Sequence, residues 1–581
     1  MDVLGCDQGE SAHMRLGNSR ELKEERSLLI ACLLIISLIA PPTFGSNPSA
    51  IIHVGGGYAI TKITYAIEIA DDRDQIIVHE GIYEENLILN KRLTLVARGN
   101  VTVIGSNDLE PTVSISSRET VVKGFNLRSG GVLFVAVLKI LPDSTSNEVL
   151  NNTITNGYFG IQSDRSSGNT IRGNIVARNV FGISFNASSA NVFEQNLVSS
   201  NKYGILINSG ENNIIRSNNL TADEYGIYLY RSKYASITDN ELVDDDTGIY
   251  LTGFSTDASI VKNTIASSQY GIVIDAAHSN LATDNWIYRS MFGISLTNCR
   301  GNIVTQNSVE DGTIGIWCMD TISNTCSLNS IVRNKIGMMI DKGYNDSISG
   351  NSLVGNAAHA LSLYKSNNVT IEGNSIASSD NGIVLDKSNY NILQNNRVNM
   401  TSTGIYLYQS EYNIIRGVSI DNAESWYIRS SSKYYNYATN LLLDNQIFDF
   451  RFLGAFAASR PVFDIQFPQN YTYLGKGIFV NVTEGSYLLL NLSYRDIPGG
   501  ITSDKLAILF TTDNAIWRKP SKLEINESSH VIATLIETSG SYGLFSYSEE
   551  KSTGFNALIA IPVLIVVSLL AYFATRRGMK K

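Results

Sequence analysis

The strongest candidates for catalysis or metal binding are acidic residues in two segments, ADEYG (222–226) and DDDTG (244–248), which lie 22 residues apart. The carboxylates are Asp223, Glu224, Asp244, Asp245 and Asp246. If the two segments stack, like charges meet and repel. A calcium ion could hold them through its preferred oxygen ligands, or two of them could act as general acid and nucleophile or base. The default interpretation is a solvated acidic corner with splayed side chains.

Histidines, lysines and arginines give little support for a copper site or for a polysaccharide-cleaving active site. The histidines are scattered in sequence, with no two at a metal-binding separation: His53, His79, His278, His359 and His530. This pattern argues against a copper site, which needs an imidazole or soft-ligand cluster. No lysine or arginine column accompanies the acids, so a polysaccharide-cleaving enzyme is an alternative rather than the expectation.

A repeat of about 22 residues organises the middle of the chain. A Gly-Ile pair or its equivalent marks one ladder: Gly160, Gly182, Gly204, Gly226, Gly248, Gly271, Gly293, Gly315, Gly337, Ala360, Gly382 and Gly404. Asparagines keep the same interval: Asn152, Asn174, Asn196, Asn218, Asn240, Asn263, Asn285, Asn307, Asn329, Asn351, Asn374 and Asn396. Self-similarity at a fixed period indicates a repeat architecture.

Short runs of alternating apolar and polar residues within each unit predict strands rather than helices. Several short strands per 22 residues describe one coil of a parallel β-helix, with successive coils about 4.8 Å apart. Ile205 and Ile207 should point inward. The asparagines should occupy corners, where they tolerate left-handed backbone and their amides can bond from coil to coil. Glycine should serve a tight bend that enters a strand. We expect about 15 coils and a rod about 70 Å long.

Tyrosines recur beside the glycine ladder and should point outward. We predict that ligands bind along a strip formed by Tyr228, Tyr230, Tyr250, Tyr406 and Tyr408. Exposed aromatic rings beside amides and carboxylates suit the C–H faces of sugars. Aromatic stacking between neighbouring strands explains the same recurrence without a ligand.

The repeats resemble the right-handed parallel β-helix family, which includes NosD-like copper-enzyme accessory proteins and carbohydrate-binding and sugar-hydrolase β-helices. Residues 54–70 resemble the strand and capping helix that open such proteins, and residues 74–105 resemble their first coils. The resemblance implies an all-β, pectin-lyase-like solenoid. It also implies, as an alternative function, an accessory role in copper or nitrous-oxide reductase maturation.

The chain divides into six predicted segments. They are a leader with a signal peptide or N-terminal anchor (1–46), a cap with the first coils (50–128), β-helix repeats (129–445), a β-rich stalk domain resembling a sandwich (446–550), a transmembrane helix (555–575) and a basic cytoplasmic tail (576–581). An apolar span of about 20 residues is long enough to cross a bilayer, and the basic residues after it favour the cytoplasmic side.

Composition and charge limit the classes of molecule that we expect this protein to bind. The net charge is −9 and no basic run interrupts the repeats, which argues against nucleic acid. Asn-x-Ser/Thr sequons occur at Asn100, Asn151, Asn186, Asn219, Asn345, Asn368, Asn399, Asn470, Asn481, Asn491 and Asn526. Cys318 and Cys326 fall at inward positions, as small buried side chains or as a local disulfide. Taken together, these features predict a membrane-anchored extracellular protein, non-catalytic, that binds or organises glycans or envelope glycoproteins.

Overall fold

The computed structural model describes residues 50–548, except for 132–133, 462, 464–465, 496, 498–500 and 513–515. The predicted leader, membrane helix and basic tail lie outside the described residues. Within the described part, no helix is both long enough and apolar enough to cross a membrane.

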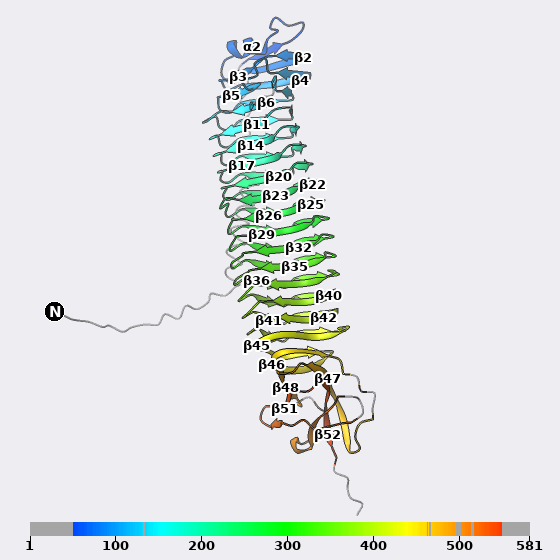
Figure 1. Cartoon of the computed structure of the whole chain (residues 1–581). Coiled ribbons are helices and arrows are strands. Elements are labelled where there is room, and N and C mark those ends of the chain that lie inside the picture. The colour runs from blue at the N-terminus through cyan, green and yellow to red at the C-terminus, as the bar shows by residue number, and fades with distance from the viewer. Residues whose placement is uncertain are drawn as a thin grey trace, which may run out of the picture.

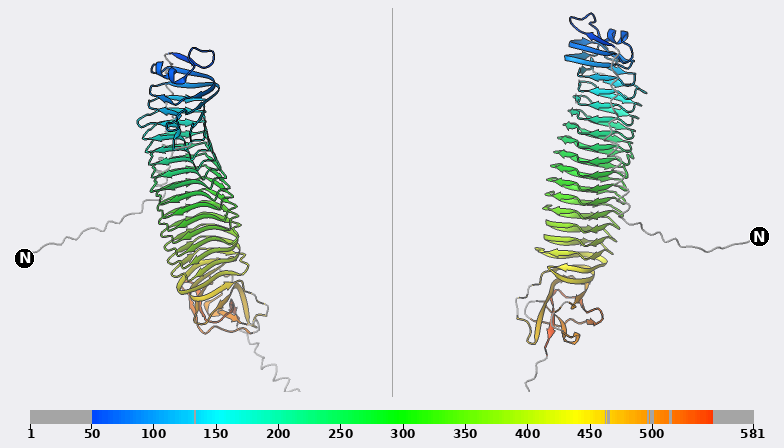
Figure 2. Two further views of the ribbon diagram at one scale, coloured as in Figure 1. Left: turned by 45° about the horizontal axis from the view of Figure 1, so that its top comes forward. Right: turned by 180° about the vertical axis from the view of Figure 1, so that it is seen from behind.

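Strands stacked in coils form one long rod (Figure 1). The rod makes about 18 turns, and Figure 2 shows the same unbroken stack from two further directions. The expectation of about 15 coils was too low. Coils at both ends lack the glycine and asparagine markers, yet their strands still pair in parallel with their neighbours.

The N-terminal end of the rod is covered by one short helix, α2 (Ile63–Ile69). Its residues Ile63, Ala66 and Ile67 are buried against the first coils. This amphipathic pattern was visible in the sequence, and the predicted capping helix is confirmed. A cap of this kind covers core side chains that the first coil would otherwise leave in water.

Each regular coil contributes strands to three parallel faces. The first short-strand face contains β1 (Ile51–Val54), β2 (Gln75–Glu84), β4 (Thr94–Ile104), β6 (Val121–Lys123), β9 (Glu148–Leu150), β12 (Thr170–Arg172), β15 (Val192–Glu194), β18 (Ile214–Arg216), β21 (Ser236–Thr238), β24 (Ser259–Val261), β27 (Leu281–Thr283), β30 (Ile303–Thr305), β33 (Thr325–Ser327), β36 (Ser347–Ser349), β39 (Thr370–Glu372), β41 (Ile392–Gln394) and β43 (Ile414–Arg416).

The second short-strand face contains β7 (Asn126–Arg128), β10 (Thr153–Thr155), β13 (Ile175–Ala177), β16 (Leu197–Ser199), β19 (Asn219–Thr221), β22 (Glu241–Val243), β25 (Thr264–Ala266), β28 (Trp286–Tyr288), β31 (Ser308–Glu310), β34 (Ser330–Val332), β37 (Ser352–Val354) and β44 (Ser419–Asp421). Toward the end of the rod, the second short strand fuses with the long strand of the same coil in β40 (Ser375–Asp386) and β42 (Arg397–Tyr408).

The long-strand face carries the Gly-Ile ladder. Besides β40 and β42 it contains β3 (Leu87–Leu89), β5 (Val113–Ile115), β8 (Ala136–Ile140), β11 (Phe159–Asp164), β14 (Phe181–Asn186), β17 (Tyr203–Asn208), β20 (Tyr225–Tyr230), β23 (Thr247–Thr252), β26 (Tyr270–Asp275), β29 (Phe292–Thr297), β32 (Ile314–Met319), β35 (Ile336–Asp341), β38 (His359–Tyr364) and the start of β45 (Trp426–Leu443).

Alternation along the long strands fills the core as predicted. Ile205 and Ile207 are fully buried and lie in register between Ile183 and Phe185 on one side and the equivalent residues of β20 on the other. Every coil therefore adds the same inward pair, and burial of apolar surface accumulates along the whole rod.

Corners follow a rule that the repeat alone did not give. A residue with left-handed backbone comes first and a buried polar residue follows, as in Ser217 (φ 52) before Asn218 and Asp239 (φ 55) before Asn240. The left-handed residue turns the chain, and the next side chain enters the interior. The prediction that the asparagines themselves take the left-handed backbone was therefore displaced by one residue, while their coil-to-coil bonding is confirmed.

The glycine ladder has a different cause from the predicted tight bend. Gly204 and Gly226 are absent from the left-handed region, which holds other glycines of the described chain. A Cβ on Gly204 would instead lie 2.6 Å from the carbonyl oxygen of Gly226, on the next coil. Close approach between coils, rather than a special φ, disfavours larger residues in this ladder, where Ala360 is the one member that is not glycine.

The pairing changes direction after β45. This strand pairs in parallel with β42 and antiparallel with β46, so an antiparallel domain continues from the last coil (Figure 1). Its elements are β46 (Gln446–Ser459), β47 (Tyr471–Val482), β48 (Tyr487–Ser493), η1 (Ser503–Lys505), β49 (Leu506–Thr511), β50 (Leu523–Asn526), β51 (Val531–Ile536) and β52 (Gly540–Tyr547). It covers the open end of the solenoid, which protects an exposed strand edge.

Candidate functional site

The five acidic residues do not share one surface. Asp223 and Asp245 each follow a left-handed residue and turn into the interior, where they are 2% and 1% exposed. Glu224, Asp244 and Asp246 remain on the outside, and Glu224 lies 3.8 Å from the ammonium of Lys202. In the described part of the chain, no group of three or more histidine, cysteine or acidic side chains is arranged to hold a metal ion.

Asp223 and Asp245 belong to a third polar ladder, which sequence inspection missed. The backbone N–H of Asn201 donates to Asp223 Oδ1 (2.6 Å), and that of Asp223 donates to Asp245 Oδ1 (2.8 Å). The second carboxylate oxygen, Oδ2, of each aspartate is buried without a hydrogen-bond partner among the described residues. Spacing could have revealed this ladder, because Asn179 and Asn201 precede the two aspartates at the same 22-residue interval.

Burial dominates the electrostatics of this pair. It raises the pKa of Asp223 to about 7, against the lowering effect of the Asn201 hydrogen bonds. It raises the pKa of Asp245 to about 8; the hydrogen bond from Asp223 opposes this rise, while the charges of Asp223, Asp244 and Asp246 add to it. Desolvation penalises the charged form of a carboxyl group, which explains both directions.

Aromatic rings form a surface array on the long-strand face. The rings of Phe181, Tyr203 and Tyr225 are stacked about 5 Å apart, with interplanar angles of 5° and 9°. Tyr228 lies across this array at 84° to Tyr225 and 79° to Tyr250. We call Tyr203, Tyr225, Tyr228 and Tyr250 the tyrosine cluster; all four are half-buried.

Polar groups surround the tyrosine cluster. Tyr250 donates its hydroxyl hydrogen to Asp275 Oδ2 at 3.1 Å. Desolvation, followed by the charge of Asp275, raises the pKa of the Tyr250 hydroxyl to about 12. Desolvation also raises the pKa of Tyr225, and the charge of Glu224 adds to the rise. The rings thus form an apolar floor with carboxylates at its edge.

The other predicted tyrosines stand apart. The guanidinium of Arg231 covers Tyr230 at 5.0 Å, and that of Arg429 covers Tyr406 at 5.1 Å. Tyr406 and Tyr408 belong to β42, seven pairings along the face from β23. At about 4.8 Å per pairing this is roughly 34 Å, so the five predicted residues do not form one continuous strip.

A second set of tyrosines lies on a corner that was not predicted. Tyr390, Tyr412 and Tyr434 are stacked with centroids 5.1 and 5.7 Å apart and are 57%, 38% and 43% exposed. We call them the tyrosine column. Their 22-residue spacing is visible in the sequence, outside the glycine ladder.

Two histidines that are far apart in sequence meet near the N-terminal cap. Parallel pairing of β1 with β2 brings His53 Nδ1 to 2.9 Å from His79 Nε2. The ring of Tyr58 stacks on both imidazoles. The prediction that no two histidines approach a metal-binding separation was therefore wrong, because sequence distance does not measure distance between neighbouring strands.

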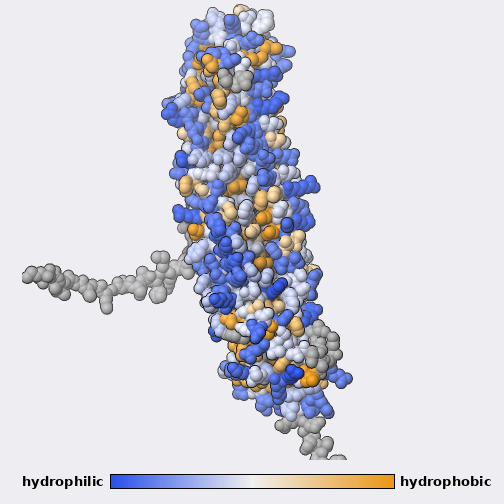
Figure 3. Space-filling model, in the orientation of Figure 1, coloured by the Kyte–Doolittle hydropathy of each residue, from blue (hydrophilic) through white to orange (hydrophobic). Residues whose placement is uncertain are grey.

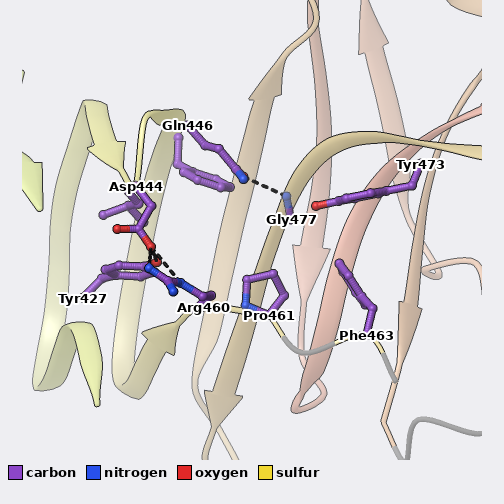
Figure 4. Close-up of a pocket in the computed structure, with 10 residues that line it drawn as sticks. Tyr427, Asp444, Gln446, Arg460, Pro461, Phe463, Tyr473 and Gly477 are labelled. Atoms are coloured by element: carbon purple, nitrogen blue, oxygen red, sulfur yellow. Dashed lines mark hydrogen bonds and ion pairs between the residues drawn. The ribbon is translucent and has the colours of Figure 1, made fainter. Parts of the chain in front are cut away.

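A cavity of about 350 Å³ lies where β45, β46 and β47 meet. Figure 4 shows Tyr427, Asp444 and Arg460 grouped at one side of it and the Tyr473 ring at the other. Tyr427 donates its hydroxyl hydrogen to Asp444, and Arg460 Nε donates to the same oxygen at 2.8 Å. The polar groups satisfy one another, and the rim includes residues next to positions outside the described chain.

Cysteines and sequons complete the survey. Cys299, Cys318 and Cys326 are buried and free, with the sulfurs of the last two 4.0 Å apart. None of the eleven sequon asparagines is a buried ladder residue. All eleven are exposed or half-exposed, so the fold leaves each of them open to a glycosylating enzyme.

Family comparisons agree with the coil geometry. Residues 128–269 and 254–385 match the family described as periplasmic copper-binding protein (NosD), and residues 337–481 match the right-handed β-helix region. The chain is a right-handed β-helix repeat protein. This β-helix protein is also 27% identical over 136 residues to a cell surface glycoprotein of Methanothermus fervidus.

That match covers 23% of the β-helix protein and 21% of the relative, so the chain spans about a fifth of the relative's own length.

Solved structures share the architecture at low similarity. The A-module of a mannuronan C-5 epimerase from Azotobacter vinelandii is 13% identical, with a TM-score of 0.29, over 61% of this chain and 93% of that one. A DFA-IIIase from Arthrobacter chlorophenolicus A6 is 12% identical, with a TM-score of 0.31, over 48% and 83%. The Dettilon tailspike protein is 11% identical, with a TM-score of 0.28, over 82% and 88%. These likenesses concern the β-helix fold alone.

Proposed function

We propose that this protein is a non-catalytic, membrane-anchored rod of the cell surface that binds glycan chains through the tyrosine cluster. The observation that carries the proposal is the half-buried aromatic floor at Tyr225, Tyr228 and Tyr250, with rings in two orientations and carboxylates at its edge. Aromatic rings accept the C–H faces of sugars, and carboxylates accept hydrogen bonds from sugar hydroxyls. Figure 3 shows apolar surface scattered among polar surface along one side of the rod, which suits a flat polar polymer.

Burial of Asp223 and Asp245 supports a non-catalytic role. A polysaccharide outside the rod cannot touch carboxyl groups that are packed between coils, and a general acid must come within hydrogen-bond reach of its substrate. The outward acids Glu224 and Asp246 keep the enzymatic alternative testable. If Glu224→Gln and Asp246→Asn abolished a measured polysaccharide turnover, the non-catalytic proposal would fail.

The test is a glycan array probed with the full-length chain and with Y228A/Y250A. We expect binding to one glycan class and a loss of at least about tenfold in affinity in the double variant, because buried aromatic contacts dominate such sites. Y390A/Y412A is the matched control, since it removes two exposed tyrosines elsewhere on the rod. A blank array, or equal losses from both double variants, would refute the proposal.

A second candidate is the accessory role in copper handling, which the His53–His79 pair favours. His53 Nδ1 and His79 Nε2 lie 2.9 Å apart and share a hydrogen bond in this structure. Imidazole nitrogens are ligands that copper accepts, so these two atoms would hold the ion. Both residues lie outside the segments that match the NosD family.

Titration with Cu(II), followed by electron paramagnetic resonance, tests this candidate. Nitrogen hyperfine structure that disappears in H53A and in H79A would support it. His278→Ala is the control, because that ring lies on a distant coil. A copper signal that is unchanged in both pair variants would exclude the site.

A further inference from the structure

In the third polar ladder, the asparagines at positions other than the two aspartates make the same side-chain hydrogen bond in each coil. Each Nδ2 donates to the main-chain carbonyl 25 residues earlier, Asn179 to Ile154, Asn201 to Val176, Asn334 to Val309 and Asn356 to Ile331. In these four coils a hydrogen-bond donor occupies this atom position, whereas Gly157 and Gly312 hold the corner in other coils with no side chain at all. An ionised carboxylate has no donor, since both of its oxygens only accept.

Oδ2 of each aspartate occupies the position of that amide nitrogen. A Cβ on Gly182 would lie 3.2 Å from Asn201 Nδ2, and a Cβ on Gly204 would lie 2.6 Å from Asp223 Oδ2. By strand register, the equivalent acceptors are the carbonyls of Val198 for Asp223 and Leu220 for Asp245. A carbonyl facing an ionised carboxylate would place two buried acceptors against each other with no proton between them, which is costly.

Among the described residues, no lysine or arginine forms an ion pair with Asp223 or Asp245. The ionisable side chains on the adjoining strands and corner are Lys202, Tyr203, Glu224, Tyr225, Glu241, Asp244 and Asp246. Lys202 lies 3.8 Å from Glu224, and the acids outnumber it. The glycine backbone of the preceding coil packs on both Oδ2 atoms, at 2.6 and 2.8 Å from the ideal Cβ positions, so this side of each oxygen is closed to a hydrated ion.

We propose that Asp223 and Asp245 are a buried proton-binding pair, held as neutral carboxylic acids whose Oδ2–H groups replace the amide donors of the ladder. Their ionisation loosens the coils around them, so the rod contains a pH-sensitive segment at residues 201–245. This proposal does not rest on the proposed glycan binding.

The direction of the pH effect follows from the raised pKa values, about 7 for Asp223 and about 8 for Asp245. Unfolded aspartate titrates near pKa 3.9, so the folded state holds more protons between about pH 4 and pH 8. Stability from this pair is complete below about pH 4 and declines as pH rises through the folded pKa values.

Hydrogen exchange of the full-length chain tests the proposal locally, as suits a repeat protein. We expect D223N/D245N to slow amide exchange in residues 201–245 by at least about tenfold at about pH 8.5, roughly 1.4 kcal/mol, and to change it little at about pH 5. Residues 334–356, where the same corner carries asparagines, provide the internal reference. In difference infrared spectra at about pH 6, the band of a protonated carboxyl should be weaker in the variant than in the wild type.

Three outcomes would overturn the proposal. The first is faster exchange in D223N/D245N at alkaline pH. The second is an unchanged protonated-carboxyl band. The third is protection of residues 201–245 by added calcium chloride that the double variant loses, which would make the pair a cation site instead.

Discussion

Asp346 and the Asp223–Asp245 pair occupy the same kind of ladder position in one rod, yet they meet different partners. Asp346 Oδ1 accepts the backbone N–H of Asn324 at 2.7 Å, as Asp223 Oδ1 accepts that of Asn201. Asp346 Oδ2, however, accepts the hydroxyl hydrogen of Thr321 at 2.7 Å. Asp223 Oδ2 has no partner among the described residues.

The coil therefore fixes where each aspartate carboxyl group lies, and one neighbouring side chain decides whether that carboxyl group is ionised. Thr321 lies 25 residues before Asp346, the same offset as Val198 before Asp223. A hydroxyl can donate to an ionised carboxylate, whereas a carbonyl only accepts. Burial raises the pKa of Asp346, and the Thr321 hydrogen bond lowers it again in part. Four substitutions break or sharpen this comparison.

The largest effect is expected where the amide ladder is uninterrupted. Asn240 Oδ1 accepts from the backbone of Asn218, and its Nδ2 donates to the carbonyl of Ile215. N240A removes the side-chain acceptor of the Asn218 N–H and the side-chain donor to the Ile215 carbonyl and leaves a cavity, so we expect a loss of about 3 to 5 kcal/mol in local opening free energy. Hydrogen exchange of the neighbouring coils measures it, and a loss below about 1 kcal/mol would contradict a structural role for the ladder.

A smaller effect is expected from the glycine that packs on the acid. In G226A the new Cβ would lie 2.8 Å from both Asp245 Oδ2 and the carbonyl oxygen of Gly248, and we expect a cost of about 2 to 3 kcal/mol. G373A is the control: Gly373 has φ +62 and open space around it, so only backbone strain of about 1 kcal/mol applies. Thermal unfolding should rank the two variants in this order, and the reverse ranking would refute the close-packing argument.

Removing the hydroxyl partner should convert Asp346 into a residue like Asp223. In T321V the lost hydrogen bond raises the pKa of Asp346 further, because that bond favours the ionised form. We expect about 1 to 2 kcal/mol of destabilisation near pH 8 and less near pH 5. T325V, at a half-buried strand position on the same coil as Thr321, should show no such pH dependence in hydrogen exchange.

The smallest effect belongs to the exposed tyrosine column. Tyr412 stacks between two rings on the surface and is 38% exposed. We expect Y412S to cost less than about 1 kcal/mol, since cross-strand surface pairs contribute little. A thermal shift as large as that of G226A would show that the column stabilises the rod.

Much of the fold could be predicted from the sequence, because residues 22 positions apart are structurally equivalent on successive coils. It predicted the parallel strands, the inward Ile205 and Ile207, and the coil-to-coil bonding of the asparagines. It did not reveal which acids enter the core. Asp223 and Glu224 are neighbours with similar side chains, and only the left-handed turn at Ala222 sends the first inward and the second out.

The candidate sites divide in the same way. Sequence alone determined the repeat, the core stripe and the outward tyrosines, because these depend on local alternation and period. Tertiary structure decided that Tyr228 lies across its neighbours, that His53 meets His79, and that Oδ2 of Asp223 and of Asp245 is buried without a partner among the described residues. Each of these depends on which atoms face each other between coils, and an interval along the chain does not contain that information.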